Sequence, residues 1–300
     1  MGMNFAGLDL GGTKCAAILA EVDGRDIRFL ARKEVKTQGD WRSIVDPLAA
    51  FLLEESERRG VKIAACGISC GGPLDGKAGR ILNPPNLMSF ENVDIAAWAE
   101  AALGCPARLQ NDADACALAE WRFGAGRGAQ NMIFLTFGTG LGAGLILDGR
   151  LYTGASNLAG EAGHIRLEPE GPVGYRKAGS FEGFCSGGGI RQFIQLRTGE
   201  DFDARELYAR AEAGDRAAIA LWREIGLRFG RGLAVLVDIL NPELVVAGSI
   251  FARAYKYLYE AALEGLQEEA LPESLRGFRL VPAALGDAIG DYAAIAIAMG

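Results

Sequence analysis

The chain lacks the features that identify several classes of protein. Its 300 residues include six cysteines but no Cys-x-x-Cys pair, a single histidine, and no uncharged apolar run of the roughly 20 residues that a membrane-spanning helix needs. No basic stretch followed by an apolar segment opens the sequence, as it would in a secretory leader. We therefore expect a cytoplasmic protein with reduced, mostly buried thiols, no cysteine-based metal site and no membrane partner.

An excess of basic charge is also missing. The sequence has 31 lysines and arginines against 38 aspartates and glutamates, a formal net charge of -7. Nucleic acids and anionic membranes attract basic surfaces, so neither is expected as a partner. Small anions remain candidate ligands because backbone N–H groups bind them without any positive side chain.

The order of the predicted elements repeats along the chain. In the first half, hydrophobic patterning predicts three strands joined partly by the hairpin signal Asp23-Gly24, then a helix that ends at Gly60, then another strand. The ranges are 4–10, 14–22 and 27–35 for the first strands, 41–59 for the helix and 62–69 for the last strand.

A second copy of this plan begins near residue 131. Strands are predicted at 131–137, 145–147 and 150–154, with Asp148-Gly149 as a hairpin turn, followed by a helix at 217–240 and a strand at 243–249. Such a repeat indicates an internal duplication into two α/β domains. We place the smaller one at 1–118 plus a C-terminal helix at about 287–300, and the larger one at 119–286. The glycine-rich stretch 154–189 shows neither the apolar periodicity of a helix nor that of a strand. A long irregular segment of this kind in a compact protein is typically functional.

Glycine clusters after strands are candidate phosphate-binding devices. No G-x-x-x-x-G-K-[ST] loop occurs, and "GTGLGAG" (138–144) leads into a hairpin and not into the helix that a dinucleotide fingerprint requires. One glycine-rich hairpin tip in each copy would let phosphate oxygens approach backbone N–H groups. The alternative is two ordinary tight turns. Asp9 beside the first tip suits a water-mediated Mg²⁺, or else it caps the turn.

Two further stretches carry candidate reactive groups. "LQNDADACALAEW" places Asn111 and Asp112 before a helix, where they act as a helix N-cap, as a general base with its orienting amide, or as both. The 154–189 stretch holds the single histidine with Glu161 and Glu182. Carboxylates and an imidazole are suited to binding sugar hydroxyls, although a lone histidine is more often structural.

The ordered motifs resemble those of the ROK family of sugar kinases and sugar-responsive repressors. They are "DLGGTK" (9–14), "LNPPN" (82–86), "NDADA" (111–115), "GTGLGAG" (138–144) and "GEAGH" (160–164). The resemblance covers essentially the whole chain, to "GDAIGDYAAIAIAM" (286–299). Within the family, the chain looks like the glucokinases and N-acetylmannosamine kinases.

The resemblance implies a duplicated actin-like ATPase fold of the ribonuclease H-like, hexokinase type, with two α/β domains and an interdomain cleft. It also implies ATP with Mg²⁺, transfer of the γ-phosphoryl group to a hexose or N-acetylhexosamine, usually at the 6-hydroxyl, and a homodimer. By similarity Asp112 is the general base. The sugar would be held by Asn111, Glu161, His164 and Glu182. The nucleotide and its metal would contact Asp9, Gly11, Gly12, Thr13, Lys14, Gly138, Thr139, Gly140 and Gly248.

One departure from the family pattern is large. Members commonly carry C-x-C-G-x-x-G-C-x-E, whose three cysteines bind a structural zinc together with the histidine. Aligned back from Glu182, those cysteine positions hold Val173, Tyr175 and Ser180. Without thiolates we expect no tetrahedral zinc site, and we expect packing through Tyr175, Phe181 and Phe184 to order the segment instead.

Two other functional classes stay open at this point. A catalytically silent sugar sensor would keep the sugar-binding residues and lose the phosphate site, and an actin-like ATPase would hydrolyse ATP without needing sugar. The repressor branch adds an N-terminal helix-turn-helix region; because the first strand begins near residue 4 and the net charge is negative, we expect no DNA binding. Glucose, mannose, fructose, allose and N-acetylmannosamine kinases share these motifs, so the sugar remains open.

Overall fold

The structure of the protein, a computed structural model, describes residues 2–300 and contains two compact units. Unit 1 extends to Gly128 and adds Thr153–Leu158 and Leu285–Gly300, while unit 2 comprises Ala129–Tyr152 and Ala159–Ala284. Residues 119–128, which the sequence-based division assigns to the second domain, complete a helix of unit 1 and its exit turn.

Unit 1 is built on a five-stranded sheet in the order β3-β2-β1-β4-β7. β1, β2 and β3 form an antiparallel meander, and β4 and β7 continue the sheet parallel to β1. The bounds are β1 Met3–Leu10, β2 Lys14–Asp23, β3 Asp26–Lys36, β4 Ile63–Cys70 and β7 Ala107–Asn111. The short pair β5 (Leu74–Asp75) and β6 (Arg80–Ile81) lies outside this sheet.

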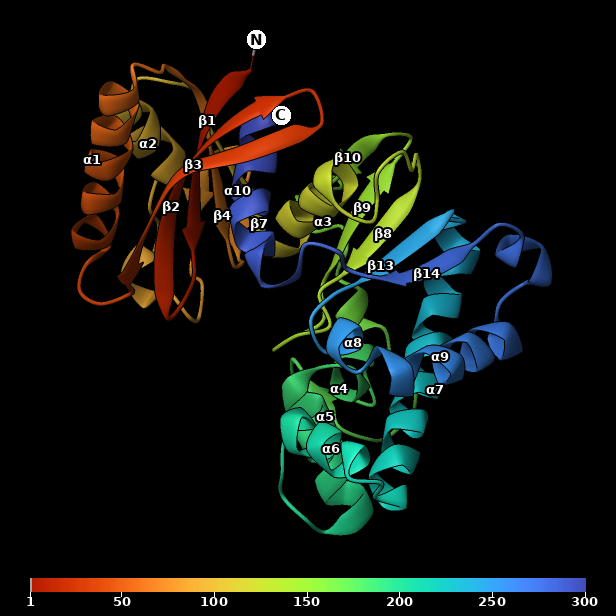
Figure 1. The fold of residues 1–300 in the computed structure, drawn as a ribbon. Coiled ribbons are helices and arrows are strands. Elements are labelled where there is room, and N and C mark those ends of the chain that lie inside the picture. The colour runs from red at the N-terminus through yellow and green to blue at the C-terminus, as the bar shows by residue number, and fades with distance from the viewer. Residues whose placement is uncertain (1) are drawn as a thin grey trace. The chain divides into compact units, whose positions relative to one another are not determined.

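Helices cover both faces of the unit 1 sheet (Figure 1). α1 (Trp41–Arg59) and α2 (Ile95–Leu103) pack on one face, where Ile44, Leu48 and Leu52 of α1 join a buried cluster with the strands. α3 (Asp112–Phe123) and α10 (Ile289–Met299) lie on the other face. The last helix of the chain thereby returns to the first strands.

Unit 2 repeats the topology of unit 1. Its sheet has the order β10-β9-β8-β13-β14, again an antiparallel meander of three strands extended by two parallel strands. The bounds are β8 Met132–Leu135, β9 Ala143–Leu147, β10 Arg150–Tyr152, β13 Leu244–Ala247 and β14 Arg279–Pro282. The predicted internal duplication is thus confirmed at the level of strand order and direction.

Local signals set several of the turns and helix ends. Asp148 and Gly149 both have positive φ, 51° and 68°, as a two-residue type I′ hairpin turn requires. Gly60 ends α1 in the left-handed region at φ 63°, and Asn241 ends α7 in the same way at φ 42°. These turns and stops confirm the predictions made from the sequence.

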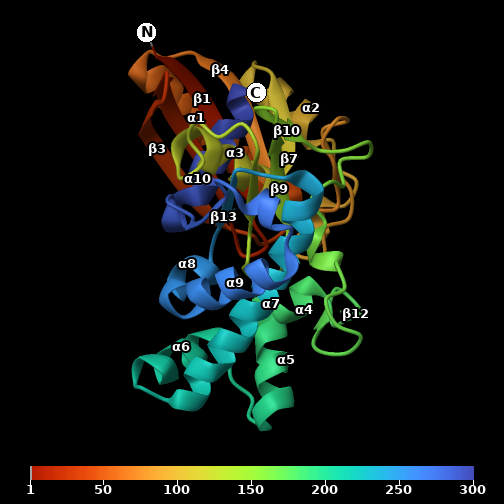
Figure 2. The ribbon, with the colours of Figure 1, turned by 90° about the vertical axis from the view of Figure 1, so that its right-hand side faces the viewer.

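Helices α4 to α9 of unit 2 gather on one side of its sheet (Figure 2). Phe229 and Trp222 of the 25-residue α7 are fully buried against this sheet and its neighbouring helices. The bounds are α4 Phe181–Phe184, α5 Gly187–Thr198, α6 Ala204–Glu212, α7 Arg216–Leu240, α8 Ile250–Arg253 and α9 Tyr255–Glu269. Within residues 2–300, no helix has the length and apolar character that crossing a bilayer would need.

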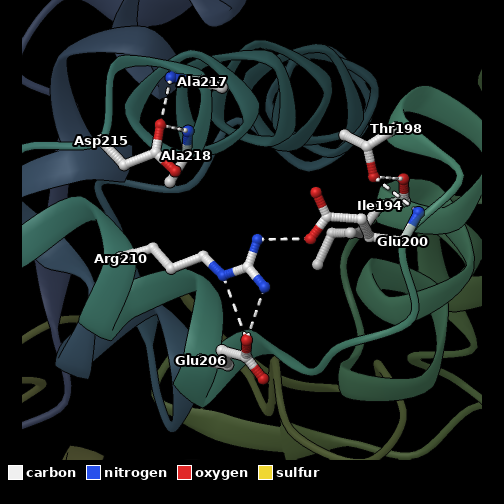
Figure 3. A network of polar contacts seen from close by, with 8 residues as sticks. All are labelled: Ile194, Thr198, Glu200, Glu206, Arg210, Asp215, Ala217 and Ala218. Carbon is white, nitrogen blue, oxygen red and sulfur yellow. Dashed lines mark hydrogen bonds and ion pairs between the residues drawn. The ribbon is translucent and has the colours of Figure 1, made fainter.

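A polar network fixes the corner formed by α5, α6 and α7 (Figure 3). Arg210 contacts the carboxylates of Glu200 and Glu206, each at 2.6 Å, and Asp215 caps α7 by accepting hydrogen bonds from the N–H groups of Ala217 and Ala218. Exposed ion pairs contribute about 0–1 kcal/mol each and a cap about 1 kcal/mol. None of the predicted site residues belongs to this corner.

The predicted state of the cysteines agrees with the structure. Five of the six are buried, and Cys116 is partly buried. Burial raises the pKa of the Cys66 and Cys185 thiols, which keeps them protonated and unreactive at neutral pH.

Candidate active site

The parallel strands of unit 1 end at one common edge. In the register of the sheet, Leu10 of β1 lies opposite Cys70 of β4, and Cys70 lies opposite Asn111 of β7. Residues that follow these three positions therefore emerge side by side. In open α/β sheets, ligands bind outside the carboxyl ends of the strands.

An open cavity of about 180 Å³ lies at this edge. Asp9, Gly11 and Gly12 from the first motif line it, together with Asp112 at the start of α3. The remaining lining comes from the ends of neighbouring segments: Leu10, Ser69, Cys70, Gly71, Gly72, Pro84, Pro85, Asn86 and Leu87. Unit 1 thus brings together four residues that the sequence predicts for the site, three from the first motif and Asp112 about one hundred residues later.

Negative charge accumulates around Asp9. Burial and, to a smaller extent, the nearby carboxylates of Asp291 and Asp112 together raise its pKa to about 6, against smaller opposing effects of Arg32 and Lys14. Asp291 is itself held by the Arg32 guanidinium, whose Nε lies 2.9 and 3.1 Å from its two carboxylate oxygens. Two carboxylates thus lie on the wall of the cavity and a third lies beside them, although no three His, Cys, Asp or Glu side chains of residues 2–300 are grouped closely enough to hold a metal ion directly.

Asn111 is the N-cap of α3. Its Oδ1 accepts hydrogen bonds from the N–H groups of Ala113 (2.8 Å) and Asp114 (3.1 Å). The prediction that Asn111 is a helix N-cap is therefore confirmed. The cap uses only Oδ1, so the side-chain NH₂ of Asn111 can bind another group. The same cap fixes Asp112 as the first helical residue, with an exposed side chain at the cavity.

The first glycine turn uses part of its own hydrogen-bonding capacity. The N–H of Gly11 donates to the carbonyl of Lys14 at 3.1 Å, and the Gly11 carbonyl accepts from the Thr37 hydroxyl at 2.6 Å. A Cβ on Gly12 would lie 2.7 Å from the Asn86 carbonyl oxygen, so the absence of a side chain is required by the protein itself. In this turn, the N–H groups of Gly12 and Thr13 are therefore the ones predicted to donate to a phosphate.

Two predicted residues of the first motif lie apart from the cavity, and Asn111 does not line it either. Thr13 and Lys14 are exposed and do not line it. The Lys14 ammonium pairs with the Glu34 carboxylate of β3 at 2.9 Å. A phosphate contact by Lys14 would require this exposed pair to open, which costs little in water.

In unit 2 the second glycine turn is held by its own neighbours. The Gly138 N–H donates to the Gly140 carbonyl (2.9 Å), and the Gly142 N–H donates to the Thr136 hydroxyl (2.9 Å). Thr139 and Gly140 are consequently the backbone donors on which phosphate binding by this turn depends.

Glu182 connects this turn to the irregular segment. Its Oε2 accepts a hydrogen bond from the Leu141 N–H at 3.0 Å. A Cβ on Gly140 would lie 2.9 Å from that same oxygen, so a side chain there would push the Glu182 carboxylate away from its present position. The carboxylate expected to hold sugar therefore also shapes the turn expected to hold phosphate.

Glu161 precedes a single 3₁₀ turn, η2 (Ala162–His164), and His164 is its last residue. Glu161 is exposed, and His164 is partly buried with its ring 5.0 Å from the ring of Tyr175. The Phe181 N–H donates to the Ile165 carbonyl at 2.7 Å, which joins this turn to α4 and hence to Glu182. Unit 2 thus brings the three predicted sugar-binding residues into one region.

Gly248 follows the end of β13, beside the end of β8. Its N–H donates to the Leu135 carbonyl at 2.9 Å, and a Cβ on Gly138 would lie 3.3 Å from the hydroxyl oxygen of the next residue, Ser249. Ser249 has φ 53° and ψ -114°, a strained backbone for a residue with a side chain. Such strain is concentrated at functional sites, and no local sequence signal predicts it here.

The expected packing of the irregular segment needs one correction. Phe181 and Phe184 are buried as predicted, with ring centroids 5.8 Å from Phe229 and Phe193, respectively. Tyr175 is instead 72% exposed and lies at the tip of a short hairpin. It contributes little to the core because a two-residue hairpin tip projects away from it.

Comparison with known proteins identifies the family of the chain. Residues 5–300 match the ROK family. The chain is 30% identical to the glucokinase of Thermotoga maritima over 98% of its length and 97% of that protein. It is 34% identical to the N-acetylmannosamine kinase of Citrobacter koseri over 90% of its length and 91% of that protein.

Solved structures show the same fold. The ROK hexokinase from Thermus thermophilus has a TM-score of 0.86 at 34% identity, covering 99% of this chain and 98% of that one. A ROK family glucokinase from Streptomyces griseus in complex with glucose and AMPPNP has a TM-score of 0.76 at 28% identity, covering 99% of both chains. The fold is therefore the duplicated actin-like ATPase fold, and the chain belongs to the ROK family.

Proposed function

We propose that the chain is an ATP-dependent sugar kinase that transfers the γ-phosphoryl group to the 6-hydroxyl of a hexose or N-acetylhexosamine. One observation carries the proposal: Asp9, Gly11, Gly12 and Asp112 line the same cavity at the carboxyl edge of the unit 1 sheet. The similarity of the chain to glucokinases and N-acetylmannosamine kinases over most of its length supports the same class of reaction.

Unit 1 supplies the base. Asp112 accepts the proton of the attacking hydroxyl, and the NH₂ of Asn111 orients the sugar while its Oδ1 caps α3. Phosphoryl transfer depends mainly on positioning and charge stabilisation, so one carboxylate base is sufficient. The cap fixes the start of the helix and thereby the base.

Unit 2 supplies further contacts. Glu161, His164 and Glu182 accept or donate hydrogen bonds to sugar hydroxyls. The N–H groups of Thr139 and Gly140 approach the phosphates, and Gly248 lines the adenosine site. The 3.0 Å bond between Glu182 and the Leu141 N–H supports a shared role of this region in sugar and phosphate binding.

The residues present fit the magnesium ion that ATP brings. Asp9 would hold it through water, with Asp112 and Asp291 adding negative charge nearby. When bound, the ion neutralises charge on the phosphates. The protein's part is the cluster of carboxylates, whose mutual repulsion a cation would relieve.

A silent sugar sensor is the less favoured candidate. Such a protein has no need for a cavity that combines a carboxylate base with the glycine turn of the first motif, yet both are present.

A cytoplasmic homodimer without nucleic-acid partners remains part of the proposal, supported by the family and the net charge of -7.

A coupled assay of ADP release tests the proposal. Purified protein is given MgATP with glucose, mannose, fructose, allose or N-acetylmannosamine, and without sugar. We expect ADP release that depends on one of these sugars, a sugar 6-phosphate as product, and no transfer to the 6-deoxy analogue of that sugar. ADP release at the same rate with and without sugar would instead identify an ATPase. Sugar binding without ADP release would identify a sensor.

A further inference from the structure

The segment after His164 lacks the groups of a zinc site. Of the three positions that carry thiolates in zinc-binding relatives, Val173 has no donor atom and Ser180 uses its hydroxyl to cap α4, accepting from the Gly183 N–H at 3.0 Å. Tyr175 projects into solvent at 72% exposure. This donor set does not fit a tetrahedral Zn²⁺, which takes thiolate, imidazole and carboxylate ligands. The segment must therefore fix His164 by other contacts.

A short hairpin with a two-residue turn contains two of the three aligned cysteine positions, Val173 and Tyr175. β11 (Val173–Gly174) pairs antiparallel with β12 (Lys177–Ala178), and the turn residues Tyr175 and Arg176 have φ 40° and 67°. Two successive residues in the left-handed region are typical of a type I′ turn, which usually takes asparagine, aspartate or glycine. An aromatic side chain at the first of these positions is unfavourable for the turn, so its presence points to a contact made by the ring.

That contact is with His164. The rings of Tyr175 and His164 meet edge to face, with centroids 5.0 Å apart and planes at 66°. The Lys177 ammonium, on the second strand of the hairpin, donates to the His164 carbonyl at 2.6 Å. The hairpin thus contacts both the side chain and the backbone of the same residue.

The base of the hairpin is anchored to α5. The side-chain amide of Gln192 accepts a hydrogen bond from the Val173 N–H and donates one to the Val173 carbonyl, both at 3.0 Å. This pair of bonds fixes one strand of the hairpin to a 12-residue helix without any metal ion. An anchored strand gives Tyr175 and Lys177 a fixed position from which to hold His164.

We propose that Tyr175 and Lys177 are positioning residues for His164, and that the hairpin 173–178 orients the imidazole for the sugar in place of a metal ion. The inference deepens the proposed function and rests on it, because it assigns the binding of a sugar hydroxyl to His164. Tyr175 limits rotation of the imidazole, and Lys177 fixes the turn η2 that carries it. Neither residue takes part in proton or phosphoryl transfer.

Three variants separate the effect of the Tyr175 ring from the effect of the backbone contacts of the hairpin. Tyr175→Gly removes the ring and suits the positive φ, so the turn backbone is retained. Tyr175→Phe keeps the ring, and Lys177→Met removes the donor to the His164 carbonyl. Tyr152→Gly, which truncates another exposed tyrosine of unit 2, is the matched control.

Steady-state kinetics are measured with the sugar that the wild type phosphorylates, glucose or N-acetylmannosamine. We expect Tyr175→Gly and Lys177→Met to raise the sugar KM by about tenfold with the ATP KM nearly unchanged, because only sugar orientation is lost. Tyr175→Phe and Tyr152→Gly should remain within about twofold of wild type. A sugar KM unchanged in Tyr175→Gly would overturn the inference while leaving the proposed kinase intact.

The imidazole itself gives a readout that does not depend on activity. Because His164 is the only histidine, selective isotope labelling of histidine gives imidazole NMR signals that come from this residue alone. Loss of the ring in Tyr175→Gly should shift these signals by removing a ring current at 5.0 Å, while Tyr152→Gly should leave them in place. Unshifted signals would overturn the contact between the rings. Shifted signals in a protein without sugar-dependent ADP release would support the contact and count against the proposed function alone.

Discussion

The Glu182 carboxylate accepts a hydrogen bond from the Leu141 N–H at 3.0 Å, joining the segment predicted to hold sugar to the turn predicted to hold phosphate. The turn at 138–142 also closes on itself through the Gly138 N–H and the Thr136 hydroxyl. Removing Glu182 should therefore loosen the turn at the side where Thr139 and Gly140 lie.

Two substitutions of Glu182 separate its two roles. Glu182→Gln keeps an oxygen that can accept from the Leu141 N–H, so we expect a higher sugar KM and a nearly normal ATP KM. Glu182→Ala leaves that N–H unpaired, which costs about 1–3 kcal/mol when buried, and should raise both KM values. Equal effects of the two variants on the ATP KM would show that the hydrogen bond does not shape the phosphate site.

Asp112→Asn should abolish most of the turnover. The amide cannot accept the hydroxyl proton, and loss of a general base typically lowers kcat by about 10²–10⁴-fold. Sugar affinity, measured by calorimetry, should stay within about threefold of wild type because the amide still forms hydrogen bonds. Asp203→Asn, another aspartate at a helix start, is the control and should be fully active. A nearly normal kcat in Asp112→Asn would rule out this base.

Asn111 offers a test that distinguishes its cap from its substrate contact. Asn111→Asp preserves an oxygen for the Ala113 and Asp114 N–H groups, so the free energy of unfolding should change by less than about 0.5 kcal/mol. Its lost NH₂ should raise the sugar KM by about tenfold. Asn111→Ala should in addition lower the free energy of unfolding by about 1 kcal/mol. Sugar binding unchanged in Asn111→Asp would assign Asn111 to the cap alone.

Asp9 makes stability depend on pH. Its pKa of about 6 in the folded protein exceeds the ordinary 3.8, so the unfolded chain ionises first as the pH rises and stability falls between about pH 4 and 6. In metal-free buffer, Asp9→Asn should therefore raise the free energy of unfolding at pH 7.5 by at most about 3 kcal/mol, and by much less at pH 4. Urea titrations at both pH values measure this. An Asp9→Asn variant that is less stable than wild type at pH 7.5 would contradict the cause assigned to the shift.

The metal content of the purified protein tests whether residues 165–186 are ordered without a zinc ion. Because Val173 and Ser180 do not supply zinc ligands, elemental analysis should find no stoichiometric zinc, and a chelator should leave the thermal unfolding midpoint unchanged. One equivalent of zinc that resists dialysis would show that other residues bind it and that the alignment of the segment is wrong.

Local structure followed from the sequence wherever neighbouring residues decide it. Asp148-Gly149 predicts a hairpin turn because both positions need positive φ, and Gly60 and Asn241-Pro242 end helices for the same kind of reason. The repeated order of strands, and from it the duplication, could likewise be predicted from periodicity. Strand ends were less accurate: the strand predicted at 131–137 ends at Leu135, because Thr136 turns its hydroxyl to the Gly142 backbone.

Long-range contacts could not be predicted in this way. Strand register alone aligns Leu10, Cys70 and Asn111 and so forms the cavity around Asp9 and Asp112. The return of the final helix brings Asp291 to Arg32, 259 residues earlier in the chain. Nothing in the local sequence marks Gln192 as the anchor of the hairpin beneath Tyr175.

The sequence by itself therefore determined the family, the duplicated plan and the candidates for the reactive groups, because turn chemistry, periodicity and motif order are properties of neighbouring residues. Only the tertiary structure decided which backbone donors are already bonded within the protein, why Asp9 holds its proton unusually strongly, and what orients His164. Those properties arise from burial and from contacts between segments distant in the chain, which no local pattern encodes.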